Sequence, residues 1–241
     1  MEVVCGRNAV REALGRPGRV KRVYLAEGAR PEGPVAEIAR LAQSQGVAVE
    51  VRRRQELDRL AGPVAHQGVV AETRPYEYAS LVEVLDNATA PGNVALLLVL
   101  DCLQDPQNLG SLLRTAEAVG AHGVVIPRQR AAGVTPAVER ASAGAVEHLR
   151  IAQVANLTQA LEAMKARGIW AAGLEKAAQS KPYDQVDWRL PVALVVGSEG
   201  RGMSRLVREH CDFLVDIPMR GRVGSLNAAV AGSIVLYEIL R

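Results

Sequence analysis

Aromatic side chains are scarce in this sequence of 241 residues: they make up 3% of it, with one phenylalanine and two tryptophans. A hydrophobic core must therefore be built mainly from valine, leucine, isoleucine and alanine. The apolar fraction of 49% is ordinary for a globular protein, and this composition favours packed α/β layers. The length indicates one large domain or a small domain joined to a larger one, and we expect two.

Cysteine is rare too, and its placement argues against a zinc site. Cys5, Cys102 and Cys211 lie far apart, without the short paired spacing of zinc ligands. We expect reduced, structural thiols and no metal. The chain also lacks an apolar run of the roughly 18 residues that a membrane span needs, and its first residues lack the apolar stretch of a signal peptide. These absences predict a soluble, cytoplasmic protein with no membrane partner.

No strong excess of either charge is present. Lysine and arginine number 29 against 26 aspartates and glutamates, and the net charge of +3 does not by itself indicate a polyanionic partner. Six basic residues nevertheless lie between Arg7 and Arg22, and Arg52 to Arg54 form a run. Such clusters suit contacts with phosphates, and they equally suit a solvated face with salt-bridge partners. The sequence leaves both interpretations open.

The hydrophobic pattern predicts two α/β units joined by a linker. Residues 1–73 alternate helices (8–14, 35–45 and after 55) with strands (20–25, 47–51 and 68–71). Residues 74–93 contain Pro75, Pro91 and Gly92 around one weak helix at 81–85, which is typical of a linker. Residues 94–241 alternate strands (94–100, 123–126, 151–154, 169–172, 192–196, 213–217) with helices (109–119, from 135, 157–167, 226–240). This order predicts an open, mostly parallel sheet with helices on both faces.

Ligands of such sheets bind beyond the carboxyl ends of the strands, so three loops are candidate sites. The first, DCLQDPQNLGSLLR at 101–114, contains Asn108, which can cap the following helix, and Arg114, expected near the same helix end. The alternative is that Asn108 is only a cap and Arg114 only a surface cation.

The second loop, GSEGRGM at 197–203, follows a strand and is rich in glycine, which permits close backbone approach to a ligand. Its glycines do not follow the G-x-G-x-x-G order of dinucleotide sites. It has Met203 where a phosphate loop needs lysine. These departures argue against NAD and ATP, and a tight turn without a ligand stays open.

The third loop, IPMRGRVGSLNA at 217–228, cannot be regular helix before Ser225 or Asn227, because Pro218, Gly221 and Gly224 interrupt it. Its exposed amides and carbonyls can bind the edge of an adenine. Simple helix capping is the alternative.

The order of these segments carries a family resemblance. DPQNLGSLLRTAEAVG, VVGSEGRGMSRL and DIPMRGRVGSLNAAVAGSIVLYE resemble motifs one, two and three of the TrmH/SpoU group of SPOUT RNA methyltransferases. CGRNAVREAL and HQGVVAE resemble the RNA substrate-binding domain that precedes the catalytic domain in ribosomal RNA members. The RlmB-type 23S rRNA guanosine 2′-O-methyltransferases look most similar, and the resemblance spans essentially the whole chain.

The resemblance implies an RNA substrate-binding domain at 1–73, a linker at 74–93 and a SPOUT catalytic domain at 94–241 with a C-terminal trefoil knot. It also implies a homodimer and S-adenosylmethionine as cofactor, without a metal. The cofactor residues implied are Gly197, Ile217, Met219, Ser225, Leu226 and Asn227. Of these, Gly197, Ile217 and Leu226 are expected to act through their backbones.

The implied reaction is methylation of a ribose 2′-hydroxyl, and the family assigns activation of that hydroxyl to the arginine at Arg114. A guanidinium with a pKa above about 12 is not an ordinary general base. We therefore expect Arg114 to hold a neighbouring phosphate and polarise the hydroxyl, while an RNA phosphate takes the proton. Asn108, Glu199, Ser225 and Asn227 match the family's other polar site positions.

The expected RNA contacts are Arg7, Arg11, Arg201, Arg220 and Arg222, whereas a lone histidine such as His66 is more often structural. Gly224 and Ala228 depart from the residues that relatives often carry. Two other functions stay open: a transfer RNA 2′-O-methyltransferase, and a non-catalytic RNA-binding protein of the same fold.

Overall fold

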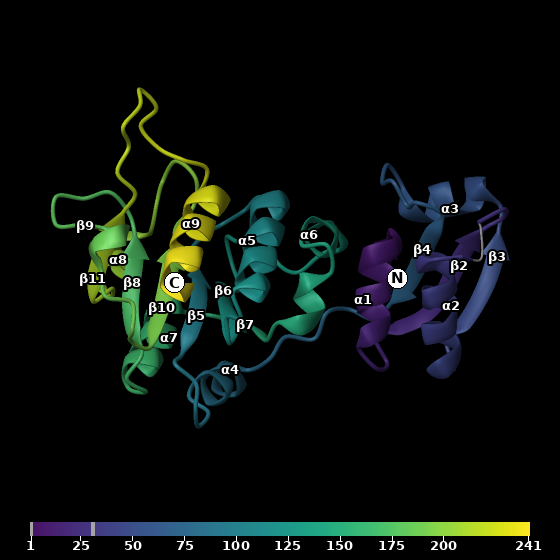
Figure 1. Ribbon diagram of the computed structural model, residues 1–241, viewed down its shortest axis with the longest axis horizontal. Helices are drawn as coiled ribbons and strands as arrows, with labels where there is room; N and C mark the ends of the chain where they lie inside the picture. The colour runs from purple at the N-terminus through teal and green to yellow at the C-terminus, as the bar shows by residue number, and fades with distance from the viewer. Residues whose placement is uncertain (1, 30–31) are drawn as a thin grey trace. The chain divides into compact units, whose positions relative to one another are not determined.

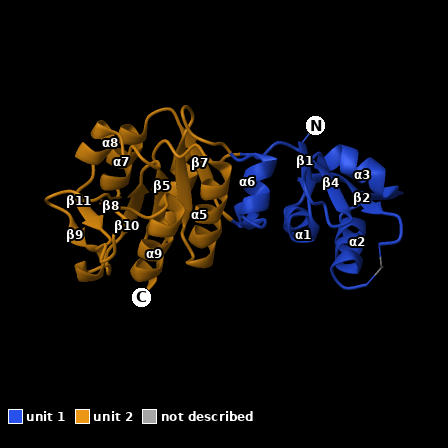
Figure 2. Ribbon diagram, turned by 90° about the horizontal axis from the view of Figure 1, so that it is seen from above, with its two compact units in different colours: residues 1–77, 134–148 blue, residues 78–133, 149–241 orange. Residues whose placement is uncertain are grey.

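The computed structural model describes residues 2–29 and 32–241 and divides the chain into two compact units. The first unit comprises residues 1–77 together with 134–148, and the second comprises residues 78–133 and 149–241 (Figure 2). The expected linker at 74–93 is therefore largely part of the second unit. Helix α4 (Leu81–Ala88) is capped by Ser80 and buries Val84 and Leu85 in that unit's core, so the segment is not a free connector.

The first unit contains a four-stranded sheet in the order β1-β4-β2-β3. Strands β1 and β2 pair antiparallel with β4, and β2 pairs parallel with β3. The strands are β1 (Glu2–Cys5), β2 (Val20–Ala26), β3 (Ala48–Arg52) and β4 (Val69–Thr73), and the helices are α1 (Arg7–Gly15), α2 (Pro34–Ser44) and α3 (Arg54–Ala61). The pattern of the sequence does not predict β1, a strand of four residues that forms by pairing with β4.

Two apolar clusters lie on this small sheet. Val10, Leu14 and Ile38 from α1 and α2 form one cluster with Val23 of β2. Leu57 of α3 belongs to the other cluster, which includes sheet residues of β1, β2 and β4. The helices therefore bury the apolar positions that their 3.6-residue periodicity brings to one face.

The segment 134–148 joins the first unit although it lies between β6 and β7 of the second unit in sequence. It carries α6 (Pro136–Ala141) and a short 3-10 helix (Ala145–His148). Its Glu139 and Glu147 both form ion pairs with Arg19, and all three side chains are buried. Arg19 is thus a buried structural cation with salt-bridge partners, so this member of the N-terminal basic cluster is not available to phosphates.

The second unit contains a seven-stranded sheet in the order β7-β6-β5-β10-β8-β11-β9, and every pairing in it is parallel (Figure 1). The strands are β5 (Leu96–Leu100), β6 (Gly123–Pro127), β7 (Ile151–Val154), β8 (Trp170–Leu174), β9 (Lys181–Pro182), β10 (Val192–Val196) and β11 (Phe213–Asp216). The predicted open parallel sheet is confirmed. The pattern of the sequence does not predict β9 or the helix α8 (Arg205–Glu209), because both are too short to show a period.

Helices cover both faces of this sheet, as predicted. Helices α4, α7 (Leu157–Lys165) and α8 contribute to one core cluster. Helices α5 (Pro106–Ala118) and α9 (Ala228–Leu240) lie side by side (Figure 1), joined by a hydrogen bond between Thr115 and Ser233. A Cβ at Gly232 would lie 2.7 Å from a methyl carbon of Leu112, so glycine permits this close approach.

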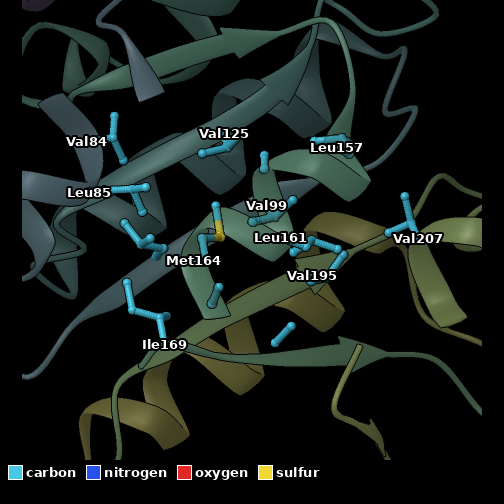
Figure 3. Packing of buried hydrophobic residues seen from close by; sticks show 14 of the residues in the cluster. Val84, Leu85, Val99, Val125, Leu157, Leu161, Met164, Ile169, Val195 and Val207 are labelled. Atoms are coloured by element: carbon cyan, nitrogen blue, oxygen red, sulfur yellow. The ribbon is translucent and has the colours of Figure 1, made fainter. Parts of the chain in front are cut away.

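The core between the sheet and α7 is aliphatic. Leu161 and Met164 of α7 point toward Val99 and Val195 of the sheet (Figure 3), and all four side chains are almost fully buried. Aliphatic side chains thus form this core, as the scarcity of aromatic residues in the sequence predicts. Burying each such side chain contributes about 1.5–3 kcal/mol to stability. No helix in the described part of the chain is long and apolar enough to cross a membrane.

Candidate cofactor site

The three loops singled out in the sequence lie at the carboxyl-end edge of the parallel sheet, and two of them line one cavity of about 590 Å³. The end of β8, the loop after β10 and the loop after β11 supply its walls, and Ala231 of α9 closes one side. Because β10, β8 and β11 are neighbours in the sheet, their carboxyl ends converge there. The cavity lies within the size range of small-molecule and cofactor sites.

The loop after β10 folds back on itself against the strand end. Ser198 and Gly202 exchange backbone hydrogen bonds at 3.0 and 2.9 Å, and Gly202 has a left-handed φ of 66°. A Cβ at Gly197 would lie 2.2 Å from the carbonyl carbon of Gly202, so only glycine fits. We call residues 197–203 the strap. Met203 ends the strap as a buried core residue, which explains why an apolar side chain occupies the position of a phosphate-loop lysine.

A hydrogen-bonded cluster connects the three loops. The side-chain amides of Asn108 and Asn227 both donate to the Glu199 carboxylate, and Asn227 also donates to the Asn108 carbonyl oxygen at 3.0 Å. Asn108 is 8% exposed. The cluster therefore fixes the strap to the start of α5 and the start of α9.

The capping hypothesis for Asn108 is wrong. Asp105 is the N-cap of α5 and accepts from the backbone N–H of Gln107 at 3.0 Å, which places Asn108 inside the first turn. Its side chain is thus free to contact the strap. Asn227 does cap α9, accepting from the backbone N–H groups of Ala229 and Val230, and its amide contacts Glu199 and Asn108 at the same time.

Two carboxylates to which the sequence assigned no role hold the end of the strap and Ser204, the residue that follows it. Asp101, 3% exposed at the end of β5, accepts from the Ser204 backbone N–H at 2.6 Å. Glu175, at the end of β8, accepts from the Met203 backbone N–H at 3.2 Å and from the Arg208 guanidinium at 2.9 Å. The signal that would have found both is their position, because each directly follows a buried parallel strand.

The residues expected to hold a cofactor gather at this cavity. Six of them line it, namely Gly197, Ile217, Met219, Ser225, Leu226 and Asn227, as does Glu199. The close backbone crossing at Gly197 and the exposed main chain of the loop after β11 fit a ligand that is bound largely through amides and carbonyls. The residues present therefore fit S-adenosylmethionine.

Arg114 is placed differently. It lies on α5 six residues beyond Asn108, or about 9 Å along the helix axis, and it shares an exposed stripe with Gln107 and Ser111. It is not among the described residues that line the cavity. Within a single chain, Arg114 therefore lies outside the hydrogen-bonded cluster.

The expected RNA-contacting arginines differ in their surroundings. Arg201, Arg220 and Arg222 are exposed on the strap and on the loop after β11. Arg7 is exposed at the start of α1, where its Nε donates to the Gln67 carbonyl oxygen at 3.2 Å. Arg11 forms ion pairs with Glu12 at 2.8 Å and Glu37 at 3.8 Å, so part of its charge is already balanced within the protein.

His66 has a structural role. It is 2% exposed, its Nδ1 accepts from the Gly68 backbone N–H at 3.0 Å, and its Nε2 lies 3.0 Å from an Asp58 carboxylate oxygen. Burial raises the pKa of the Cys211 thiol to about 12 and that of Cys102 to about 11, so both remain protonated at neutral pH. Among the described residues no group of three metal-ligating side chains converges.

Comparisons with known proteins cover the whole chain. A model described as the SpoU rRNA Methylase family matches residues 95–237, and one described as RNA 2′-O ribose methyltransferase substrate binding matches residues 3–79. A putative TrmH family tRNA/rRNA methyltransferase from Bacillus subtilis (strain 168), YacO, is 45% identical over 240 residues, covering 100% of this chain and 95% of the relative.

Solved structures agree with these matches. The SpoU methyltransferase AviRb from Streptomyces viridochromogenes, in complex with the cofactor AdoMet, is 28% identical with a TM-score of 0.80, covering 99% of this chain and 88% of AviRb. An AdoMet-bound rRNA methyltransferase from Sinorhizobium meliloti is 27% identical with a TM-score of 0.79, covering 99% of this chain and 86% of that protein. These findings confirm the resemblance seen in the motifs. The chain belongs to the SpoU family of RNA methyltransferases and uses S-adenosylmethionine as its cofactor.

Proposed function

We propose that this enzyme methylates the 2′-hydroxyl of a guanosine in 23S ribosomal RNA, and that it does so in the cytoplasm. The observation that carries the proposal is the cavity at the carboxyl ends of β10, β8 and β11, with the Asn108–Glu199–Asn227 cluster at its edge. The substrate-binding family model over residues 3–79 supports ribose 2′-O chemistry. The S. meliloti rRNA methyltransferase, similar over 99% of this chain, supports a ribosomal substrate.

In this proposal the strap and the loop after β11 hold the cofactor through Gly197, Ile217, Met219 and Leu226, with Ser225 and Asn227 beside them. S-adenosylmethionine supplies an electrophilic methyl group on a sulfonium. The chain's task is then to align the ribose oxygen in line with that methyl, which is catalysis by positioning. Asn108, Glu199, Ser225 and Asn227 orient the reacting groups, and the shared hydrogen bonds of the cluster keep them rigid.

Arg114 binds the phosphate next to the target ribose and polarises its 2′-hydroxyl. Bound S-adenosylmethionine would supply the methyl group and leave as S-adenosylhomocysteine, and the hydroxyl proton would pass to an RNA phosphate oxygen. This role fits a guanidinium, which is a donor and stays charged. Arg7, Arg11, Arg201, Arg220 and Arg222 contribute further contacts to RNA phosphates.

We further propose that the enzyme is a homodimer whose site takes Arg114 from the partner subunit. Two features support this arrangement. Arg114 is exposed and does not line the cavity of its own chain. Helix α9 is apolar on nearly all sides, and its Val230, Tyr237 and Leu240 are 48%, 55% and 55% exposed. An apolar helix face of this kind is typical of an interface. The trefoil knot implied by the resemblance stays a prediction.

The decisive experiment supplies labelled S-adenosylmethionine with unmodified 23S rRNA or with transfer RNA and then maps the 2′-O-methyl position. We expect one guanosine of 23S rRNA to be labelled, and Arg114→Ala to lose about a hundredfold or more in rate, as the removal of one preorganised hydrogen-bond donor does. Arg189→Ala, which removes an exposed arginine paired with Asp187, is the matched control. Labelling of transfer RNA alone would refute the ribosomal assignment.

The non-catalytic alternative is tested by calorimetry, since a scaffold without catalysis has no need to bind S-adenosylmethionine.

The shared site is tested by mixing two inactive variants, Arg114→Ala and Gly197→Ala, under conditions that exchange subunits. If each site is built from two chains, activity should recover in mixed dimers. One of their two sites then combines the intact strap of the Arg114→Ala chain with the intact Arg114 of the Gly197→Ala chain. If the mixture stays inactive although mixed dimers form, each chain contains its own complete site.

A further inference from the structure

The cavity contains a carboxylate, Glu175, for which the methyl-transfer scheme above has no use. Glu175 follows β8, the strand that lies between β10 and β11 in the sheet, so it sits between the strap and the loop after β11. Its side chain is 19% exposed and therefore largely enclosed. An acidic group enclosed in a cofactor cavity calls for a partner that donates hydrogen bonds.

The carboxylate is held from two directions. Its Oε1 accepts from the Arg208 Nη1 at 2.9 Å, and its Oε2 accepts from the Met203 backbone N–H at 3.2 Å. A Cβ at Gly202 would lie 3.1 Å from Oε2, so glycine leaves room beside that oxygen. An ionised carboxylate can accept about four hydrogen bonds. Two acceptor positions thus remain on a group that is already fixed in place.

The other acidic groups of the cavity are less available or less firmly held. Glu199 already accepts from both Asn108 and Asn227. Asp216 ends β11 and also lines the cavity. A ribose diol offers two adjacent hydroxyl donors, and a carboxylate at the end of a parallel strand is a common partner for ribose hydroxyls. Glu175 combines that position with a fixed orientation.

We propose that Glu175 is a cofactor-binding residue whose carboxylate accepts hydrogen bonds from the ribose hydroxyls of S-adenosylmethionine. The same carboxylate holds the strap through the Met203 N–H, so ribose recognition and strap position depend on one side chain. This inference rests on the proposed placement of the cofactor in the cavity. It predicts that the enzyme discriminates against cofactors that lack a ribose hydroxyl.

Calorimetric titration of the full chain without RNA tests this inference. The ligands are S-adenosylhomocysteine and its 2′-deoxy and 3′-deoxy counterparts. For the wild type we expect at least one deoxy ligand to bind about tenfold more weakly, the usual effect of losing a hydrogen bond to a charged group. Glu175→Gln should weaken S-adenosylhomocysteine by a similar factor and lose the discrimination. If the missing hydroxyl and Glu175→Gln weaken binding independently, so that the two factors multiply when they are combined, Glu175 does not contact the ribose directly.

Two matched variants separate ribose binding from other roles. Asp216→Asn should keep the full discrimination, and if it loses that discrimination instead, Asp216 is the ribose ligand and the inference is wrong. Arg208→Met removes the ion pair but leaves the Glu175 carboxylate, so discrimination should persist. Methylthioadenosine, which has the ribose but no amino-acid part, should also bind Glu175→Gln more weakly. Unchanged binding of methylthioadenosine would mean that Glu175 contacts the cofactor's ammonium group.

The failure of the underlying placement would look different. If Gly197→Ala binds S-adenosylhomocysteine as the wild type does, the cofactor lies outside this cavity, whatever Glu175→Gln shows. If Gly197→Ala loses binding and Glu175→Gln does not, the cavity is correct and only the assignment of Glu175 fails.

Discussion

The side-chain amide of Asn108, on the first turn of α5, donates a hydrogen bond to Glu199, which lies 91 residues further along the chain in the strap. Asn108 is buried, so this contact connects two loops that are adjacent only in the folded sheet. The start of α5 and the strap therefore cannot move independently without leaving a buried polar group unpaired.

Replacing Glu199 by alanine is expected to lower the free energy of unfolding by about 1–3 kcal/mol, because the amide of Asn108 then loses its acceptor. Binding of S-adenosylhomocysteine should weaken as well, since the strap loses its tie to α5. Urea denaturation and calorimetry measure the two effects. Glu209→Ala is the control, since its ion pair with Arg205 is exposed and should matter little. Equal stability of both variants would contradict the structural role of Glu199.

Gly197→Ala should weaken cofactor binding, because its Cβ would lie 2.2 Å from the carbonyl carbon of Gly202. The strap must shift to relieve the overlap, at a cost of about 1–3 kcal/mol, which corresponds to a loss of about fivefold to a hundredfold in affinity. Gly221→Ala is the matched control, since no atom lies within 4 Å of its added Cβ. Wild-type affinity in Gly197→Ala would place the cofactor outside this cavity.

The stability of the first unit should depend on pH through Glu139. Burial raises the pKa of its carboxyl to about 7, although Arg19 acts in the opposite direction. A glutamate in the unfolded chain titrates near about 4.3. Between these values the folded chain retains a proton that the unfolded chain has lost, so the free energy of unfolding falls as the pH rises and levels off above about 7.

Glu139→Gln removes this titration while keeping the shape of the side chain. The difference in unfolding free energy between the variant and the wild type should therefore move in favour of the variant by up to about 3 kcal/mol from pH 5 to pH 8. Urea denaturation at both pH values measures it. A difference that does not change with pH would mean that Glu139 is ionised throughout this range.

Arg220 and Arg222 are expected to contact RNA phosphates from the exposed loop after β11. Replacing either by alanine should weaken RNA binding and reduce the salt dependence of the affinity by about one phosphate contact, without altering sequence preference. Filter binding over a range of salt concentrations measures the slope. Arg189→Ala should leave the slope unchanged. An unchanged slope in Arg220→Ala and Arg222→Ala would remove both residues from the RNA interface.

Much of the second unit could be predicted from its sequence. The apolar runs at β5 and β10 are buried on both faces, so the composition of each strand specifies its environment. Strand β9 could not be predicted, because two residues are too few to show an alternating pattern. Strand β1 is as long as β7 and β11, which the sequence does predict, and it forms by pairing with β4. The role of Arg19 could not be predicted either, since its buried partners Glu139 and Glu147 lie more than a hundred residues away along the chain.

By itself the sequence determined the alternation of helices and strands, the aliphatic nature of the core and the three loops that carry the chemistry, because each depends on residue types at short spacing. Only the tertiary structure decided that Asp105 rather than Asn108 caps α5, that Glu175 faces the cavity, and that Arg114 stays outside it. The physical reason is that the order β5-β10-β8-β11 differs from the order along the chain. Hydrogen-bond partners at the sheet edge therefore come from loops that follow adjacent strands, and these loops lie far apart along the chain.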